Sequence, residues 1–394
     1  MISRRSFIKA SAFSFVGLSN SLLPGCGNNR TPDFTEPNSA LDDIGSLLPA
    51  DKNGIMLPEG FSSRVIARSG IQPYIGSPYL WHHAPDGGAT FSTVDNGWIY
   101  VSNSEMGNNA GGVGAIKFDA AGNIIDAYSI LENSNRNCAG GATSWHTWLS
   151  CEEHNTGIIW ECDPYAKRLP VKKPALGVFA HEAAALDIIT NYIYLTEDKP
   201  DGCFYRFVPD SFTTAGIPDL NSGILEVAAV DSQDLSVSWQ PVPDPGASSE
   251  PTRYQVNSST QFNGGEGIVF YNGLISFATK GDNKIWSYNT QSNKISVIYD
   301  INTHPTPILS GVDNITLTRE GEIVVGEDGG NLQVVAITKR NKLIPLAQLA
   351  GHNHSEVTGP AFSPDGKRLY FSSQRGTSGS SSDGVTFEIT GEFH

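Results

Sequence analysis

The sequence predicts an all-β fold, and within that class a six-bladed β-propeller, from three observations. The chain has 41 Gly and 23 Pro in 394 residues and only 17% charged residues, a profile of many turns that suits strands better than helices. Helical periodicity of apolar residues is nearly absent. A strand pattern recurs six times, and repeated strand units without helices are typical of a propeller, whose radial blades leave few open edges.

Each copy of the repeat has a turn residue, a short apolar or aromatic strand, and a polar or acidic end. The six copies are residues 96–105, 143–153, 191–198, 272–279, 321–328 and 366–373. We expect the final strand, 384–390, to pair with an early strand, 61–67, because a propeller needs its ring closed. Residues 209–261 are expected to contain an insertion or an irregular blade. An array of two-sheet sandwiches is the less favoured alternative.

Residues 1–26 predict a targeting segment that lies outside the fold. Residues 3–9 form a twin-arginine pattern around Arg4 and Arg5, and residues 23–26 are similar to a lipobox, in which Cys26 would be acylated. We therefore expect export to the periplasm, or an outer-membrane lipoprotein held in the membrane by Cys26, with an ordinary cleaved signal as the alternative. Residues 27–49 are expected to be a flexible tether, and residues 50–394 a single propeller domain.

The formal net charge of −15 argues against nucleic acid as a partner, because the chain has no basic footprint for phosphates. An acidic protein that handles phosphate or another anion needs cations to do so. Beyond the targeting segment no run approaches eighteen apolar residues, so no further membrane span is predicted. A Cys151–Cys162 disulfide is one pairing that stays open in an oxidising compartment.

Acidic residues gather at the ends of the repeat strands and before three further strands. If each repeat is an inner strand, these ends meet at one mouth of the axial channel, where the expected polar residues are Asn103, Glu105, Glu152, Glu153, His181, Glu182, Glu197, Asp198, Glu266, Asp313, Asn314, Glu327 and Asp328. So many carboxylates repel one another unless cations lie among them, and their oxygens suit Ca²⁺. Cys138 adds a soft ligand that iron or zinc accepts. The alternatives without a metal site are that Cys138 is a buried residue at a turn and that Glu152 faces the solvent.

No serine-hydrolase elbow, phosphate-binding Walker loop or dinucleotide glycine fingerprint occurs in the chain. Hydrolysis by metal activation is therefore the chemistry that the residues support best.

Several segments in order along the chain resemble PhoX-type alkaline phosphatases: residues 137–143, 147–153, 181–187, 194–198, 202–207, 358–366 and 384–391. The resemblance implies a six-bladed propeller that carries iron and calcium and hydrolyses phosphate monoesters at alkaline pH. It implies that Cys138 is an iron ligand, with Glu182 and Glu266 as metal-bridging carboxylates, and that Asn103 contacts the substrate phosphate. The further calcium or iron ligands that it implies are Glu105, Glu153, Glu197 and Asp328.

The chain departs from that family at two positions. Gly264 stands where the family has an Arg two residues before the Glu that matches Glu266, and Ser104 stands where the family usually has His. An Arg at position 264 would bind phosphate in a bidentate fork, and no residue near it in the sequence obviously replaces it.

The first prediction is therefore a monomeric, metal-dependent phosphomonoesterase with Fe³⁺ and Ca²⁺ as cofactors and a small phosphorylated substrate. One alternative is a non-catalytic, calcium-binding propeller lipoprotein. Another is a related metal-dependent hydrolase of phosphodiesters or lactones.

Overall fold

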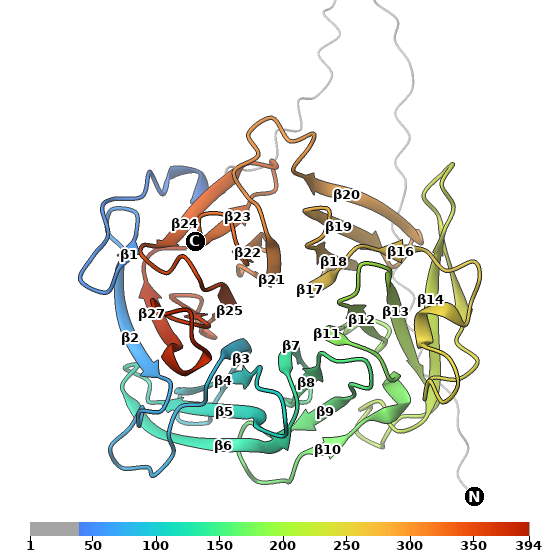
Figure 1. The fold of residues 1–394 in the computed structure, drawn as a ribbon, viewed down its shortest axis with the longest axis horizontal. Coiled ribbons are helices and arrows are strands. Elements are labelled where there is room, and N and C mark those ends of the chain that lie inside the picture. The colour runs from blue at the N-terminus through green and yellow to red at the C-terminus, as the bar shows by residue number, and fades with distance from the viewer. Residues whose placement is uncertain (1–38, 394) are drawn as a thin grey trace, which may run out of the picture. The chain divides into compact units, whose positions relative to one another are not determined.

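Six antiparallel β-sheets stand radially around a central axis in the computed structural model, which describes residues 39–393 (Figure 1). The predicted six-bladed β-propeller is confirmed. Helical structure in this part of the chain is limited to four 3₁₀ segments, η1 (Ala40–Asp43), η2 (Pro174–Leu176), η3 (Thr252–Tyr254) and η4 (Ser381–Asp383). Among the described residues no helix is long and apolar enough to cross a membrane.

The first three sheets follow one another along the chain. The first consists of β3 (Pro85–Ser92), β4 (Trp98–Ser104), β5 (Gly111–Phe118) and β6 (Ile124–Ser134), and the second of β7 (Asn137–Ala142), β8 (Trp148–Glu152), β9 (Ile159–Cys162) and β10 (Val171–Lys172). The third is the irregular blade expected over residues 209–261. It contains β11 (His181–Leu186), β12 (Ile193–Glu197), β13 (Gly202–Pro209), β14 (Gly223–Val230), β15 (Val237–Pro241) and β16 (Gln261–Phe262).

The last three sheets include two that recruit strands from the beginning of the described chain. The fourth consists of β17 (Gly265–Tyr271), β18 (Leu274–Thr279), β19 (Lys284–Asn289) and β20 (Lys294–Asp300). The fifth joins β1 (Ile55–Met56) to β21 (Val312–Leu317), β22 (Ile323–Glu327), β23 (Gln333–Ile337) and β24 (Leu343–Leu349). The sixth joins β2 (Ser62–Arg68) to β25 (Val357–Phe362), β26 (Arg368–Ser373) and β27 (Val385–Thr390).

The ring is closed in the sixth sheet, where β2 pairs with the final strand β27 in the register Ser62 to Thr390. The prediction that an early strand would meet residues 384–390 is confirmed. The buried carboxylate of Glu388 holds the joint, because it accepts from Arg64 Nη2 at 2.7 Å and from Arg368 Nη1 at 2.7 Å. The pairing with β2 covers the outer edge of β27, which leaves fewer unpaired backbone groups at the seam.

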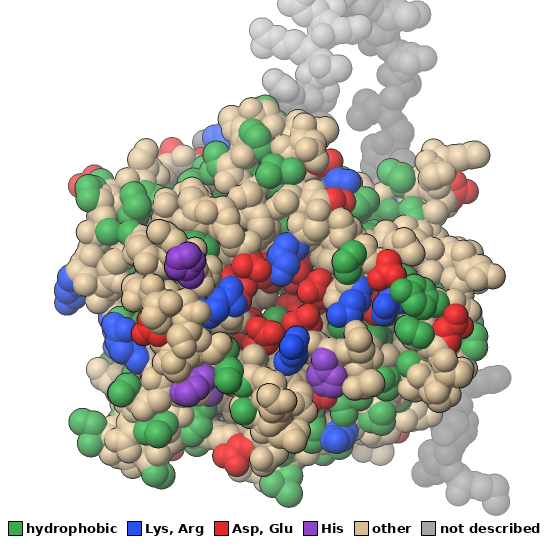
Figure 2. All heavy atoms as spheres, in the orientation of Figure 1, with side chains coloured by type: hydrophobic (Ala, Val, Ile, Leu, Met, Phe, Trp, Pro, Cys, Tyr) green, Lys and Arg blue, Asp and Glu red, His purple; other side chains and the backbone are tan. Residues whose placement is uncertain are grey.

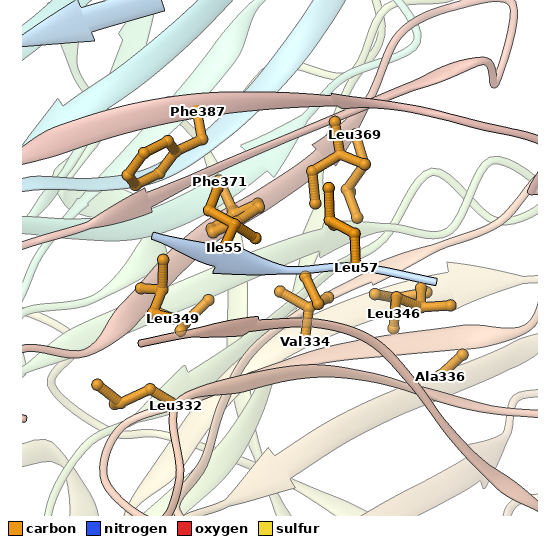
Figure 3. Packing of buried hydrophobic residues seen from close by; sticks show 14 of the residues in the cluster. Ile55, Leu57, Leu332, Val334, Ala336, Leu346, Leu349, Leu369, Phe371 and Phe387 are labelled. Atoms are coloured by element: carbon orange, nitrogen blue, oxygen red, sulfur yellow. The ribbon is translucent and has the colours of Figure 1, made fainter. Parts of the chain in front are cut away.

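Apolar side chains fill the spaces between neighbouring sheets. In the cluster between the fifth and sixth sheets, Ile55 and Leu57 lie between Leu369 and Phe371 on one side and Val334 on the other (Figure 3). Burial of each such side chain is worth about 1.5–3 kcal/mol. Leu41, at 0% exposure, belongs to the same cluster. The packed body therefore begins earlier than residue 50, and the end of the predicted tether is part of it.

The strands that surround the axis are β3, β7, β11, β17, β21 and β25, each of which contacts its two neighbours in the ring (Figure 1). The six repeats of the sequence are the second strands, β4, β8, β12, β18, β22 and β26. The expectation that the repeats are inner strands is wrong. The repeat stands out in sequence because its strands lie inside their own sheets and both of their faces are buried against the neighbouring sheets.

Candidate metal centre

Each of the six innermost strands carries a β-bulge. The register with the second strand shifts after Pro85, Asn137, His181, Gly265, Val312 and Thr358. A bulge breaks the regular alternation of side chains and re-aims one of them. In five sheets the residue directly after the last regular pair is a potential metal ligand: Asp86, Cys138, Glu182, Glu266 and Asp313.

Small residues follow four of these five potential ligands because the inner strands approach one another closely. A Cβ atom added to Gly141 would lie 2.0 Å from the carbonyl oxygen of Ala184 in the next sheet, and one added to Gly267 would lie 2.4 Å from the nitrogen of Ile315. Only glycine fits at such distances. The double glycine after Cys138 thus brings the second and third sheets together at the axis.

Three second strands end in a pair of acidic residues whose two side chains point to different places. The first residue of each pair binds its own loop: Glu327 accepts from the backbone nitrogens of Ser310 and Gln333, both at 2.8 Å. The second residue, as at Glu153 and Asp328, belongs to the channel. This division follows from the alternation of neighbouring side chains along a strand.

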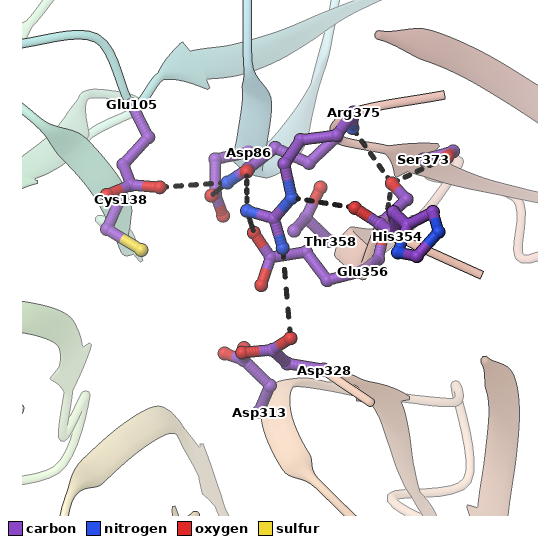
Figure 4. Close-up of polar contacts among 12 residues, drawn as sticks. Asp86, Glu105, Cys138, Asp313, Asp328, His354, Glu356, Thr358, Ser373 and Arg375 are labelled. Atoms are coloured by element: carbon purple, nitrogen blue, oxygen red, sulfur yellow. Dashed lines mark hydrogen bonds and ion pairs between the residues drawn. The ribbon is translucent and has the colours of Figure 1, made fainter. Parts of the chain in front are cut away.

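Four groups of potential ligands form a continuous series at the channel mouth. Within each group the ligand atoms lie within 4.8 Å of one another, and the groups are Asp86–Glu105–Cys138, Cys138–Glu153–Glu182, Glu182–Glu266–Asp313 and Asp313–Asp328–Glu356. Each group shares one residue with the next. Figure 2 shows acidic side chains gathered in the central hollow of this face, with Lys and Arg around them, and Figure 4 shows members converging from different strands.

This cluster of ligand groups has two sides. The Cys138 side comprises Asp86, Glu105, Cys138, Glu153 and Glu182. The Lys280 side comprises Glu266, Asp313, Asp328 and Glu356. Glu182 joins the two sides, because it shares one group with Cys138 and another with Glu266 and Asp313.

The Cys138 side is held by neutral donors. Gln374 Nε2 donates to Asp86 Oδ2 at 2.6 Å and to Glu105 Oε2 at 2.9 Å. The Cys138 thiol donates to Glu182 Oε1 at 3.4 Å. Burial, and then the charges of Asp86 and Glu182, raise the pKa of Cys138 well above its ordinary value, so that without a cation the thiol keeps its proton.

The Lys280 side contains two basic residues. Lys280 Nζ lies 2.9 Å from Glu266 Oε1, 3.2 Å from Asp328 Oδ2 and 3.6 Å from Asp313 Oδ2. Arg375 Nη1 donates to Glu356 Oε1 at 2.9 Å, and Arg375 Nη2 lies 3.9 Å from Asp328 Oδ1. These contacts offset only part of the negative charge of this side.

Burial and mutual repulsion raise the pKa values of the channel carboxylates. Burial and then Glu266 raise the pKa of Glu182 well above its ordinary value, and burial and then Glu105 raise that of Glu153 to about 8. Metal cations would reverse these shifts, since an opposite charge within a few ångströms favours the ionised form. Glu266 is buried, and its Oε1 is paired with Lys280 Nζ at 2.9 Å. A set of eight buried or half-buried carboxylates and one half-buried thiol therefore fits metal ions.

The family of the chain follows from comparison with known proteins. The model of the alkaline phosphatase PhoX family matches residues 80–158, 154–306 and 276–376. The chain belongs to the PhoX family. Its members are metal-dependent, which agrees with the ligand groups at the channel mouth.

Two solved structures share the fold. Pseudomonas fluorescens PhoX, in complex with vanadate, a transition state analogue, aligns with a TM-score of 0.71 and 18% identity over 88% of this chain and 97% of that chain. A structural genomics protein of unknown function from Bacteroides thetaiotaomicron aligns with a TM-score of 0.50 and 9% identity over 84% of this chain and 76% of that chain. A comparison with curated proteins gives no match.

Six of the eight predicted site residues come together at the channel mouth, all of them within the four ligand groups: Glu105, Cys138, Glu153, Glu182, Glu266 and Asp328. Glu197 does not. Its carboxylate accepts from Arg253 Nη1 at 3.0 Å and from Tyr205 Oη at 2.8 Å, so both oxygens are used within the third sheet. The next residue, Asp198, is the one near the channel, since its charge raises the pKa values of Glu153 and Glu266.

Asn103 is the other predicted residue that the structure places elsewhere. Its amide nitrogen donates to the carbonyl oxygens of Cys138 at 3.1 Å and Ala139 at 2.8 Å. Its amide oxygen accepts from Trp148 Nε1 at 2.8 Å and Ser150 Oγ at 2.9 Å. All four hydrogen bonds of a side-chain amide are made. Asn103 thus supports the backbone of Cys138 from behind.

The sequence analysis does not predict four residues of the mouth: Asp86, Glu356, Lys280 and Arg375. It places a fifth, Asp313, at the mouth without naming it as a ligand. Asp86 and Asp313 carry a signal in retrospect, because each occupies the bulge position that Cys138 and Glu182 occupy in their own sheets. The sequence does not mark Lys280 as a residue of the mouth, because at the equivalent position other sheets have an acidic residue.

The structure also decides three smaller expectations. Cys151 and Cys162 are both free, so the Cys151–Cys162 disulfide is absent. Gly264 has φ +70, a value that favours glycine, and a Cβ atom there would lie 3.9 Å from Lys280 Cβ. The nearest side-chain atom to that added Cβ atom is Asp198 Oδ1, at 3.3 Å, so a carboxylate and the stem of Lys280 lie beside position 264. The hydroxyl of Ser104 donates to the carbonyl oxygen of His83 at 2.8 Å and so faces its own loop.

Proposed function

We propose that this chain is a metal-dependent phosphomonoesterase of the alkaline phosphatase type. The observation that carries the proposal is the continuous series of four ligand groups, with the thiol of Cys138 shared by the first two. A cage built only to hold calcium for stability has no use for a thiolate, because calcium takes oxygen ligands. Membership of the PhoX family supports the same activity.

The proposed metal ions are Fe³⁺ and Ca²⁺. Cys138 with Glu182 and Glu153 is the proposed iron site, because iron accepts a thiolate. The three-carboxylate groups around Asp313 are the proposed calcium sites. When bound, such ions polarise a phosphoryl oxygen and lower the pKa of a water molecule.

The protein's own residues contribute to binding and orientation. Arg375 is the proposed phosphate ligand, because its guanidinium is a planar fork and Nη2 makes only a 3.9 Å ion pair. Its Nε donates to the carbonyl oxygen of His354 at 3.2 Å and its Nη1 to Gln374 Oε1 at 2.6 Å, so that the group is held in place. Asn103 fixes the backbone of Cys138 and with it the position of the thiol.

Metal analysis and a chromogenic phosphomonoester assay test the proposal on wild type, Cys138→Ala and Cys151→Ala. Cys151 is a matched control, because it is a free thiol in the same sheet but belongs to no ligand group. We expect iron and calcium in wild type and in Cys151→Ala, with turnover, and loss of iron and turnover in Cys138→Ala. Calcium alone, without turnover in wild type, would instead identify a calcium-binding propeller. Turnover of a lactone or a phosphodiester, without turnover of the phosphomonoester, would identify a related hydrolase.

We further propose that the protein is exported by the twin-arginine route as a monomer and is anchored through Cys26 at the outer membrane. The twin-arginine pattern around Arg4 and Arg5 and the lipobox-like residues 23–26 support this proposal, and both lie outside the described residues. Cell fractionation tests it: Arg4→Lys combined with Arg5→Lys should retain the protein in the cytoplasm, and Cys26→Ser should release it from the membrane fraction.

A further inference from the structure

Lys280 occupies a position that other sheets give to a carboxylate. It directly follows β18, the second strand of the fourth sheet. The residues that directly follow the second strands of the first, second, third and fifth sheets are Glu105, Glu153, Asp198 and Asp328. The fourth sheet thus supplies the ring with a positive charge in place of a negative one.

The ammonium group of Lys280 is matched to its surroundings. An ammonium has three hydrogen-bond donors, and three carboxylates lie within 3.6 Å of Nζ, those of Glu266, Asp313 and Asp328. Burial lowers the pKa of Lys280, but the charges of these three carboxylates raise it above its ordinary value overall. The group is therefore a permanent cation inside the cage.

The Cys138 side has no comparable group. Among residues 39–393, no Lys or Arg lies within 4.0 Å of the carboxylates of Asp86, Glu105, Glu153 or Glu182. The three carboxylates that Lys280 contacts instead belong to the groups Glu182–Glu266–Asp313 and Asp313–Asp328–Glu356. A divalent ion in either of these groups would compete with Lys280 Nζ for the same oxygens.

We propose that Lys280 is a built-in counter-cation that takes the place of one divalent metal ion on the Lys280 side. The chain then holds one ion fewer than its carboxylates could bind: one of the two groups around Asp313 is neutralised by Lys280, and the other remains a proposed calcium site. This inference rests on the metal-dependent function proposed above, but it concerns the number and placement of the ions and can be tested without turnover.

The experiment compares wild type with Lys280→Ala, Lys280→Arg and Lys284→Ala. Lys284 is the matched control: it pairs with Asp282 at 3.0 Å and Asp300 at 3.9 Å in the same fourth sheet but contacts no ligand group. Each protein is stripped of metal, titrated with Ca²⁺ by calorimetry, and analysed for bound metal by mass spectrometry. We expect Lys280→Ala to bind one more Ca²⁺ per chain than wild type, because removal of a cation leaves three carboxylates for the ion. Lys280→Arg and Lys284→Ala should match wild type.

Thermal unfolding gives a second readout. In the absence of metal, Lys280→Ala should unfold at a lower temperature than wild type, since the carboxylates lose their counter-charge, and Ca²⁺ should raise its unfolding temperature more than that of wild type. An alanine variant that folds only with Ca²⁺ gives the same support. If Lys280→Ala folds neither with nor without Ca²⁺, the same calcium titration is made on Lys280→Gln, which keeps most of the side-chain length.

Equal calcium stoichiometry and equal calcium affinity in Lys280→Ala and wild type would overturn the inference. The outcome is separable from that of the proposed function. A wild-type protein without phosphatase activity, whose Lys280→Ala variant gains one Ca²⁺, would refute the function and keep the inference. An active wild type whose Lys280→Ala variant binds no additional Ca²⁺ would support the function and refute the inference.

Discussion

The two sides of the channel mouth are built by the same backbone and neutralised in different ways. On the Cys138 side, carboxylates and a thiol are held by the amides of Gln374 and Asn314. On the Lys280 side, the carboxylates contact Lys280 and Arg375. The bulge that aims the ligand recurs in every sheet. The difference lies in the residue that directly follows the second strand, which is acidic in four sheets and is Lys280 in the fourth. The residue type at that position therefore decides whether a metal ion or a side chain supplies the positive charge.

The largest expected effect comes from the residue that joins the two sides. Glu182→Gln removes one negative oxygen ligand from both the Cys138 group and the Glu266 group. We expect kcat/KM for a phosphomonoester to fall at least about a hundredfold, because metal-ion stabilisation is worth several kcal/mol and each 1.36 kcal/mol is tenfold in rate. Metal content should fall as well.

Glu327→Gln is the control for this substitution. Glu327 is as buried as Glu182, but both its oxygens accept from backbone nitrogens of its own loop. It should lose stability and keep its metal content. Equal metal loss in the two variants would contradict the assignment of Glu182 as the shared ligand.

Two neighbouring residues give the next largest contrast. Glu197→Gln breaks a buried pair with Arg253, and we expect the free energy of unfolding to fall by about 3–5 kcal/mol with metal content unchanged. Asp198→Asn should instead weaken metal binding and stabilise the metal-free protein, because one repelling charge near Glu153 and Glu266 is removed. Denaturant unfolding and metal analysis measure both. Metal loss in Glu197→Gln without loss of stability would restore Glu197 as a ligand.

Substrate binding gives a third contrast, between a basic residue of the Lys280 side and an amide behind Cys138. Arg375→Gln should raise KM for the phosphomonoester about tenfold, since a charge-assisted bond to phosphate is worth about 1.5–3 kcal/mol. Asn103→Ala should cost about 1–3 kcal/mol of stability for each buried partner left unpaired, with KM unchanged. A raised KM in a well-folded Asn103→Ala would show that Asn103 does contact the phosphate.

The fold could be predicted from the sequence because its signal is local and repeated six times. The closing pair of β2 and β27 followed from the need to complete a ring. Where a motif marks a residue, as at Cys138 and Glu182, the sequence predicted a residue that the structure places in the groups of potential ligands. Glu197 was selected in place of Asp198 because the sequence shows an acidic pair but not which member faces the axis. That choice depends on the register between strands, which a bulge shifts by a residue, and on a distant partner, Arg253.

The smallest expected effect is the pH dependence of the metal-free protein, and it distinguishes the two sides. The pKa of Glu153 rises from an ordinary 4.5 to about 8, and that of Asp313, beside Lys280, from 3.8 only to about 6. The folded protein then binds more protons than the unfolded chain between those values, so stability falls as the pH rises through them. We expect the unfolding temperature to drop between about pH 4 and 8. Glu153→Gln should reduce the drop between about pH 4.5 and 8, and Asp313→Asn should reduce it only between about pH 4 and 6. The other buried carboxylates with raised pKa values, Glu327 at about 7 among them, account for the rest of the drop. Saturation with metal should reduce the drop, because bound cations hold both carboxylates ionised. A drop above pH 6 that Glu153→Gln leaves unchanged would mean that the Cys138 side is not the less neutralised of the two.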